Sequence, residues 1–329
     1  MTLAGEVLAA EIRERGSVPF SRFMEVALYH PEHGYYVTPR DPFGKEGDFY
    51  TASQLQPVFG RLIACALRQC RAALGETPGF TVVEWGAGRG EMAPGLSEFN
   101  YFGVDFACGH TPLQFEGVVF SNELFDALPV DVARIRDGVA CCMNVALGDS
   151  RFVWREAGPL RPEWQDYAMS LLPHFRGEPD VWIELPVRLR ETVAKMCAPL
   201  TRGSIVTIDY GYTARELVRF PRGTLMGYRQ HAAIDDVLRD PGLQDITAHV
   251  PFTHLEDAAR AEGLQTGPLE TLAQFLLRAG EADQFASALC ADTEPEALRL
   301  RLQLKTLLFG MGETFRVVTL SKEGLPSKS

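Results

Sequence analysis

The sequence lacks the features that would assign it to several familiar protein classes. No apolar run approaches the roughly 18 residues needed to cross a bilayer, and Met1–Arg15 mixes acidic and basic side chains. We therefore expect neither a membrane partner nor a signal peptide. The 7 cysteines form no Cys-x-x-Cys pair, and an odd number does not suit a disulfide framework. Both observations favour a cytoplasmic protein with no bound metal.

Basic residues are also scarce. The chain has 32 Lys and Arg against 43 Asp and Glu, which gives a net charge of -11. Because nucleic-acid binders are usually basic, we expect no nucleic-acid partner. An acidic surface can instead attract a basic protein segment. With 46% hydrophobic residues in 329, the chain is long and apolar enough for a large core.

One glycine-rich stretch organises the sequence. Phe80–Val83 is a short apolar run with β-branched residues, which predicts a buried strand that Glu84 closes. Gly86, Gly88 and Gly90 follow as a turn, after which we expect a helix to begin. Strand, glycine turn and helix make the nucleotide-binding corner of a doubly wound α/β sheet.

The residues around this turn restrict its ligand. A dinucleotide fingerprint would need a third glycine where Glu91 stands, and no lysine follows at the spacing of a P-loop. An acid followed by Gly-x-Gly-x-Gly is typical of class I S-adenosylmethionine (SAM) methyltransferases. SAM carries a sulfonium and an ammonium but no phosphate, which suits Glu84. We expect Ala87 to line the same site. The alternative is a tight turn without a ligand.

Polar residues end the next strands as well. Tyr101–Asp105 reads as the second strand, and a doubly wound fold places a carboxylate such as Asp105 on the ribose hydroxyls. The alternative is a solvent-exposed aspartate. Gly117–Ser121 predicts a third strand, followed by Asn122 at its carboxyl end. Only about a dozen residues separate Asp105 from this strand, so one usual element is missing or very short.

The remaining patterns suggest a decorated core. We expect a helical and lid region over 1–79 and a Rossmann-like core over 80–329. Insertions at about 130–182 and 212–312 would form a smaller second lobe. Asp137-Gly138 is a strong hairpin signal within the first insertion.

Several motifs together resemble one family. The sequence is similar to the MidA-like class I SAM-dependent methyltransferases, a family that includes a mitochondrial complex I assembly factor acting as a protein arginine methyltransferase. The matching stretches span about residues 20 to 320, and they are 23–29, 33–36, 47–51, Phe59-Gly60, 84–90, 122–129, 208–211, 245–250 and 310–312.

The resemblance implies a fold, a cofactor and an activity. It implies SAM binding at Glu84, Gly86, Gly88 and Gly90, with Asp105 at the ribose and S-adenosylhomocysteine as product. It also implies a protein substrate, with arginine the best-supported methyl acceptor. A homodimer is compatible with this interpretation.

An arginine acceptor needs carboxylates to orient its guanidinium. Glu123 and Asp126 are our candidates, and Asp209 and Tyr210 follow the next strand. His231 is a candidate proton acceptor.

Each assignment has an alternative. Asn122 and Glu123 would otherwise cap a following helix, and His231 or His249 would be a packed or surface histidine. For the whole protein, two other functions stay open. One is a non-catalytic or SAM-binding assembly factor that grips a partner, and the other is a small-molecule methyltransferase.

Overall fold

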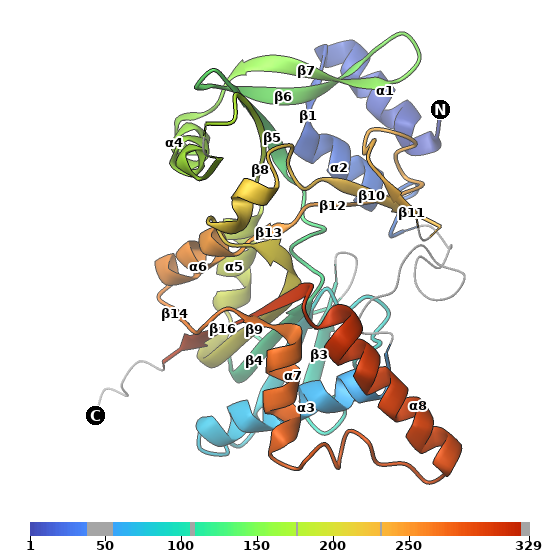
Figure 1. The fold of residues 1–329 in the computed structure, drawn as a ribbon, viewed down its shortest axis with the longest axis vertical. Helices are drawn as coiled ribbons and strands as arrows, with labels where there is room; N and C mark the ends of the chain where they lie inside the picture. Colours follow the sequence, from blue (N-terminus) through green and yellow to red (C-terminus); the bar gives the residue numbers. More distant parts are fainter. Residues whose placement is uncertain (38–54, 106–108, 176, 231, 324–329) are drawn as a thin grey trace. The chain divides into compact units, whose positions relative to one another are not determined.

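The computed structural model describes residues 1–37, 55–105, 109–175, 177–230 and 232–323. The chain divides into two compact units, shown in Figure 1. The first unit comprises Met1–Tyr50, Phe125–Arg190 and Tyr212–Thr253, and the second comprises Thr51–Leu124, Glu191–Gly211 and His254–Ser329.

A mixed sheet forms the centre of the second unit. Its strand order is β14-β16-β9-β4-β2-β3, and β15 also pairs with β16. Strands β3, β2, β4 and β9 are parallel, whereas β16 is antiparallel to β9. The strands are β2 (Thr81–Trp85), β3 (Asn100–Val104), β4 (Phe115–Asn122), β9 (Leu200–Tyr212), β14 (Gln265–Thr266), β15 (Glu270–Thr271) and β16 (Phe315–Lys322). The parallel strands of this sheet agree with the doubly wound α/β fold expected from the sequence.

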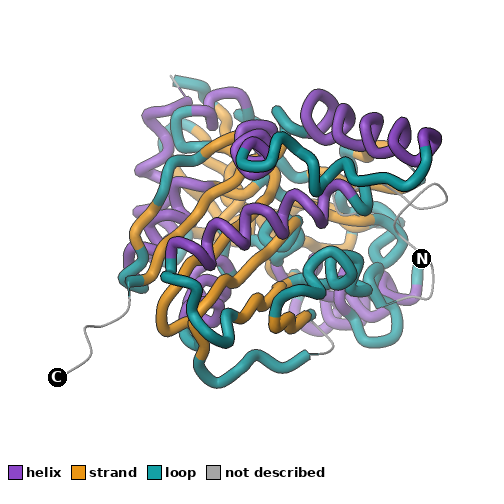
Figure 2. The backbone as a smooth tube through the Cα atoms, turned by 90° about the horizontal axis from the view of Figure 1, so that it is seen from below, coloured by secondary structure: helices purple, strands orange, loops and turns teal. Residues whose placement is uncertain are grey.

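Helices cover this sheet. The apolar side chains of α3 (Val58–Ala73) and α7 (Leu272–Glu281) join those of β2, β4 and β16 in one buried core. In Figure 1, α3, α7 and α8 (Glu294–Lys305) lie below the sheet, and α5 (Leu189–Cys197) and α6 (Phe252–Ala261) lie above it. Figure 2 shows the strands crossed by helices when seen from below. No helix in the described ranges is long and apolar enough to span a membrane.

The first unit contains two antiparallel sheets. One has the order β1-β6-β5-β8, with β7 on β6, and the other has the order β11-β10-β12. The strands are β1 (Val18–Pro19), β5 (Asp131–Arg136), β6 (Val139–Leu147), β7 (Phe152–Pro159), β8 (Asp180–Leu185), β10 (Met226–Arg229), β11 (Ala232–Ile234) and β12 (Asp245–Thr247). Helices α1 (Leu3–Arg15), α2 (Phe20–Tyr29) and α4 (Pro162–Leu171) belong to the same unit.

The hairpin predicted in the first insertion is confirmed. Arg136 pairs with Val139 across a two-residue turn, in which Asp137 and Gly138 have φ angles of 51° and 79°. Positive φ at both central residues is the geometry that Asp-Gly favours in a hairpin.

The helix expected directly after the glycine turn is not present. Residues 90–98 form successive turns instead. Pro94 lacks an amide hydrogen, and Gly95 packs so closely on α3 that a Cβ there would lie 2.9 Å from the Cα of Gly60. The short connection predicted after Asp105 agrees with the structure, because the described residues 109–114 contain no helix. Residues 38–54 of the predicted helical and lid region lie outside the described residues, and the loop at 39–47 that we expect to form the lid is among them.

Candidate functional site

The glycine turn after β2 has a backbone that only glycine adopts easily. Gly86, Gly88 and Gly90 have φ angles of 75°, 55° and 82°, in the left-handed region where a Cβ is costly. The amides of Gly86 and Ala87 both donate to the carbonyl of Val104, at 2.9 and 3.1 Å. The turn is therefore fixed to the end of β3.

The turn also leaves space at its centre. Among the described residues, a Cβ built on Gly88 would meet only the Oε2 atom of Glu91, at 3.2 Å, whereas one on Gly86 would meet the Leu124 side chain at 3.1 Å. Gly86 is thus packed against the protein, and Gly88 presents open backbone. A ligand can approach the chain at Gly88 where a larger side chain would stand.

Carboxylates surround this open backbone. Asp105 accepts a hydrogen bond from the Gly88 amide at 2.7 Å, and Glu91 accepts one from the Arg89 amide at 3.2 Å. Glu84, only 4% exposed, accepts a hydrogen bond from the Tyr101 hydroxyl at 2.6 Å.

The charge balance of the turn follows from these groups. Burial raises the pKa of Glu84 to about 7; the Tyr101 hydrogen bond opposes this shift, and the charges of Glu91 and Asp105 add to it. Such a turn repels an anion and gains from a bound cation. This is the charge preference that the sequence predicted from Glu84.

The carboxyl end of β4 lies beside the turn. Trp85 pairs with Ser121, so Asn122 follows at the level of Gly86. The Asn122 amide donates to Glu123 Oε1 at 2.9 Å, while its Oδ1 atom is buried and has no hydrogen-bond partner among the residues that the structure describes. A buried acceptor without a partner indicates a place for a ligand or a water molecule.

Glu123 has an unusual backbone conformation. Its φ angle is 53°, and its amide donates to the Ile208 carbonyl at 2.9 Å. A non-glycine residue held there costs on the order of 1–3 kcal/mol, and such residues cluster at functional sites. Residues 123–129 form bends and a single turn and no helix, so helix capping does not explain Asn122 and Glu123.

The end of β9 brings two more candidates to the same sheet edge. Asn122 pairs with Ile208, and Asp209 and Tyr210 follow. Asp209 is fully buried, and its Oδ1 atom accepts the Tyr210 amide at 2.9 Å. The Tyr210 ring lies against Phe315, with centroids 3.9 Å apart.

Two further candidates are placed differently. Asp126 belongs to the first unit, where it is 5% exposed and its carbonyl accepts the Ala248 amide at 2.9 Å. His231 lies outside the described residues. The second unit therefore gathers all the other predicted site residues at one edge of its sheet.

Sequence reasoning missed Tyr101, and it used Glu91 only to exclude a dinucleotide. Tyr101 is two residues before Gly103, which pairs with Glu84. The hydrogen bond from Tyr101 to Glu84 depends on the pairing register of β2 and β3, which no local pattern in the sequence specifies.

These features fit SAM as a ligand. The open backbone at Gly88 admits a nucleoside, the surrounding carboxylates suit a sulfonium and an ammonium, and Asn122 Oδ1 can accept a hydrogen bond. In the described part of the chain, no group of three or more His, Cys, Asp or Glu residues is placed to hold a metal ion.

Comparison with known proteins gives a consistent picture. A family model described as "Putative S-adenosyl-L-methionine-dependent methyltransferase" matches residues 100–268. A superfamily member from Burkholderia thailandensis, solved with bound S-adenosyl-homocysteine, is 30% identical with a TM-score of 0.85, covering 97% of this chain and 92% of its own.

Two curated relatives are more distant. Protein arginine methyltransferase NDUFAF7 of Bos taurus mitochondria is 26% identical, over 95% of this chain and 82% of the relative. Its Drosophila melanogaster homolog is 26% identical, over 78% and 70%.

The family model matches half of the chain, and the Burkholderia thailandensis protein shares its fold. Both findings agree with the family resemblance that the sequence motifs indicated. The chain belongs to the MidA-like family of SAM-dependent methyltransferases, with SAM as its cofactor.

Proposed function

We propose that this protein transfers the methyl group of SAM to an arginine side chain of another protein. Two relatives that carry the name protein arginine methyltransferase support the acceptor class. The net charge of -11 supports a basic acceptor segment.

The strained backbone of Glu123 is the observation that carries this proposal. Its φ of 53° and the hydrogen bond from Asn122 hold the carboxylate in a defined orientation beside the glycine turn. A fixed carboxylate matches the planar fork of a guanidinium, which donates two parallel N–H groups.

The residues of the glycine turn and of the neighbouring strand ends would have different roles in methyl transfer. Gly88 and Asp105 hold the nucleoside, and Glu84 and Glu91 favour its positive charge. SAM supplies an electrophilic methyl group. Glu123 accepts N–H groups from the acceptor and holds the attacking nitrogen in line, while buried Asp209 supports the same sheet edge. The acceptor nitrogen would gain the methyl group as the bond from that carbon to the sulfonium sulfur breaks; S-adenosylhomocysteine would be the leaving group, and the proton lost by the nitrogen would pass to water. Positioning of this kind supplies up to roughly 7–11 kcal/mol of the barrier in well-oriented reactions.

Replacing Glu123 with glutamine tests the proposal. The amide keeps the size of the side chain and loses its charge, so an acceptor cation would be held in a wrong position. We expect turnover on an arginine-containing protein substrate to fall about a hundredfold or more, with SAM affinity unchanged. Glu313→Gln, an exposed change in the same unit, is the matched control. Unchanged turnover in Glu123→Gln would remove Glu123 from the mechanism.

A labelled-methyl assay on cell lysate separates the competing functions. Label in protein, found on arginine by mass spectrometry, supports the proposal. Label in a dialysable fraction indicates a small-molecule acceptor. SAM binding without any transfer indicates an assembly factor.

A further inference from the structure

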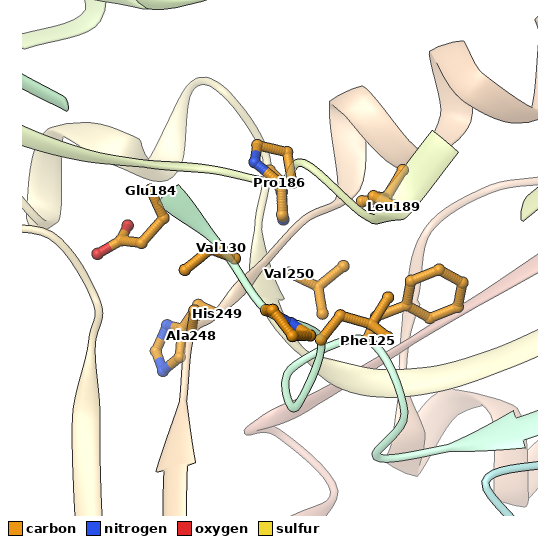
Figure 3. A pocket seen from close by; sticks show the side chains of 11 residues that line it. Phe125, Val130, Glu184, Pro186, Leu189, Ala248, His249 and Val250 are labelled. Carbon is orange, nitrogen blue, oxygen red and sulfur yellow. The ribbon is translucent and has the colours of Figure 1, made fainter. Parts of the chain in front are cut away.

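The cavity in the first unit is too small for a ligand. Figure 3 shows Phe125, Val130, Glu184 and His249 among the side chains that line it. Its accessible space is about 10 Å³, which admits at most one water molecule. A larger partner therefore needs a different surface, and helix α8 offers one.

Helix α8 and the π-helical segment that continues it, η4 (Thr306–Met311), expose apolar side chains to solvent. Leu298, Leu302 and Phe309 are 55%, 56% and 80% exposed. Steps of four, three and four residues lead from Leu298 through Leu302 and Lys305 to Phe309, so these four side chains follow one face of the helix. We call them the outer stripe. A row of exposed apolar side chains is typical of an interaction surface.

The inner face of the same helix is already packed. Leu300 and Leu307 are fully buried in the core that also contains side chains of α3 and α7. In Figure 1, α8 forms the lower right edge of the second unit. One apolar face is sufficient to attach a surface helix to its core. The outer stripe is a second apolar face, which the packing of this unit does not explain.

The charged side chains of α8 are divided along its length. Glu294 and Glu296 lie in its first turn, whereas Arg299, Arg301 and Lys305 lie in its second half. Arg301 approaches Glu294 of its own helix at 3.4 Å, but both side chains are exposed and within reach of a second helix. A helix with one acidic and one basic end is complementary to a copy of itself that runs in the opposite direction.

We propose that the outer stripe pairs with the outer stripe of a second copy of this chain, with the two helices antiparallel about a two-fold axis. An axis at the level of Leu300 sets Leu298 of each copy against Leu302 of the other. Glu294 and Lys305 stand six and five residues from Leu300 in opposite directions, so each Lys305 lies beside the Glu294 of the other copy. The two-fold symmetry forms every contact twice.

The contact between two such helices is small. Helix α8 has 12 residues and is therefore about 18 Å long. Interfaces below the standard size are weak and transient. We therefore expect monomer and dimer in equilibrium, with a Kd on the order of 1–100 µM.

Sedimentation equilibrium of the full chain measures this association. In Leu302→Glu a carboxylate would face an apolar side chain of the other copy, so we expect Kd to rise at least about tenfold. Val139→Glu, at a 63% exposed position of the first unit, is the matched control and should leave Kd unchanged. A monomer at all concentrations up to about 100 µM, or the wild-type Kd in Leu302→Glu, would overturn the inference.

Two charge-reversed variants test the antiparallel arrangement. Glu294→Lys sets two cations against each other across the interface, and Lys305→Glu sets two carboxylates against each other. We expect each variant alone to dimerise several-fold more weakly than the wild type. An equimolar mixture of the two pairs opposite charges at both contacts, so it should regain about the wild-type affinity. Absence of this recovery would reject the antiparallel pairing.

The substituted side chains are all exposed, so we expect the fold and the cofactor site to be retained. Circular dichroism and SAM titration of each variant check both, and SAM affinity should stay unchanged. Leu298→Glu places the same carboxylate on the other side of the axis, and it should weaken the dimer as Leu302→Glu does. A folded Leu298→Glu variant with the wild-type Kd would also reject the outer stripe as the interface.

Discussion

At the scale of single residues, Glu84 makes the stability of the folded protein depend on pH. Its pKa of about 7 exceeds the ordinary value of 4.5, chiefly because the carboxyl group is buried. The folded protein therefore binds this proton more tightly than the unfolded chain does between these two values. The stabilisation is fully present below pH 4.5 and is lost as the pH rises to about 7.

Glu84→Gln isolates this effect, because the amide does not titrate. Relative to the variant, we expect wild-type protein without cofactor to lose on the order of 3 kcal/mol of stability across that pH window. Urea unfolding of both proteins at about pH 5 and about pH 8 measures the difference. A constant difference between the proteins would show that Glu84 titrates normally.

Gly88 is the residue where added volume should matter most. In Gly88→Val a branched side chain would fill the open backbone position and strain a φ of 55°. We expect calorimetry to detect no SAM binding. Gly75→Val is a matched control, since Gly75 has a φ of 82° and no atom of the described residues lies within 4 Å of a Cβ built there. The control should lose about 1–2 kcal/mol of stability and keep its SAM affinity. Retained affinity in Gly88→Val would refute the role of the turn.

At the scale of elements, close backbone contacts hold the parallel strands together. Gly117 in β4 and Gly203 in β9 pair with each other and have φ angles of 151° and 138°. A Cβ on Gly203 would overlap the carbonyl oxygen of Gly117, and one on Gly117 would overlap that of Thr81. These two glycines therefore make the β2-β4-β9 spacing possible.

Gly203→Ala should consequently disrupt the sheet. We expect a loss of roughly 3 kcal/mol or more of unfolding free energy, because rigid backbone atoms would have to move. Thermal or urea unfolding measures it. Gly263→Ala is the comparison: Gly263 has a φ of 79°, and in the described part of the chain no atom lies within 4 Å of a Cβ built there. Equal losses in the two variants would mean that strand spacing is not the cause.

The same element scale explains what could be predicted from the sequence. Val82 and Val118 lie in short apolar runs with β-branched residues, a pattern typical of buried strands, and Asp137-Gly138 favours a two-residue hairpin turn. The prediction of a helix after Gly90 was wrong. Gly95 packs on Gly60, and such a contact between distant parts of the chain is not visible in the local pattern. The bond from Tyr101 to Glu84 likewise depends on strand register. Local patterns specify elements, and tertiary contacts decide where they end and which side chains meet.

At the scale of the whole molecule, the net charge of -11 would favour encounter with the basic acceptor proposed above. Raising the salt concentration from about 50 to about 500 mM shortens the range of this attraction. We expect KM for an arginine-rich protein substrate to rise several-fold, with little change in SAM affinity. Steady-state kinetics and calorimetry measure the two quantities. A KM independent of salt would indicate that the surface charge serves solubility alone.

The chain alternates between the two units, and each unit consists of three separate segments. Cutting the chain at any one point therefore cannot yield one unit free of the other: a fragment that keeps all three segments of one unit also carries two segments of the other. The two units are consequently interleaved in the gene and are inherited as one piece.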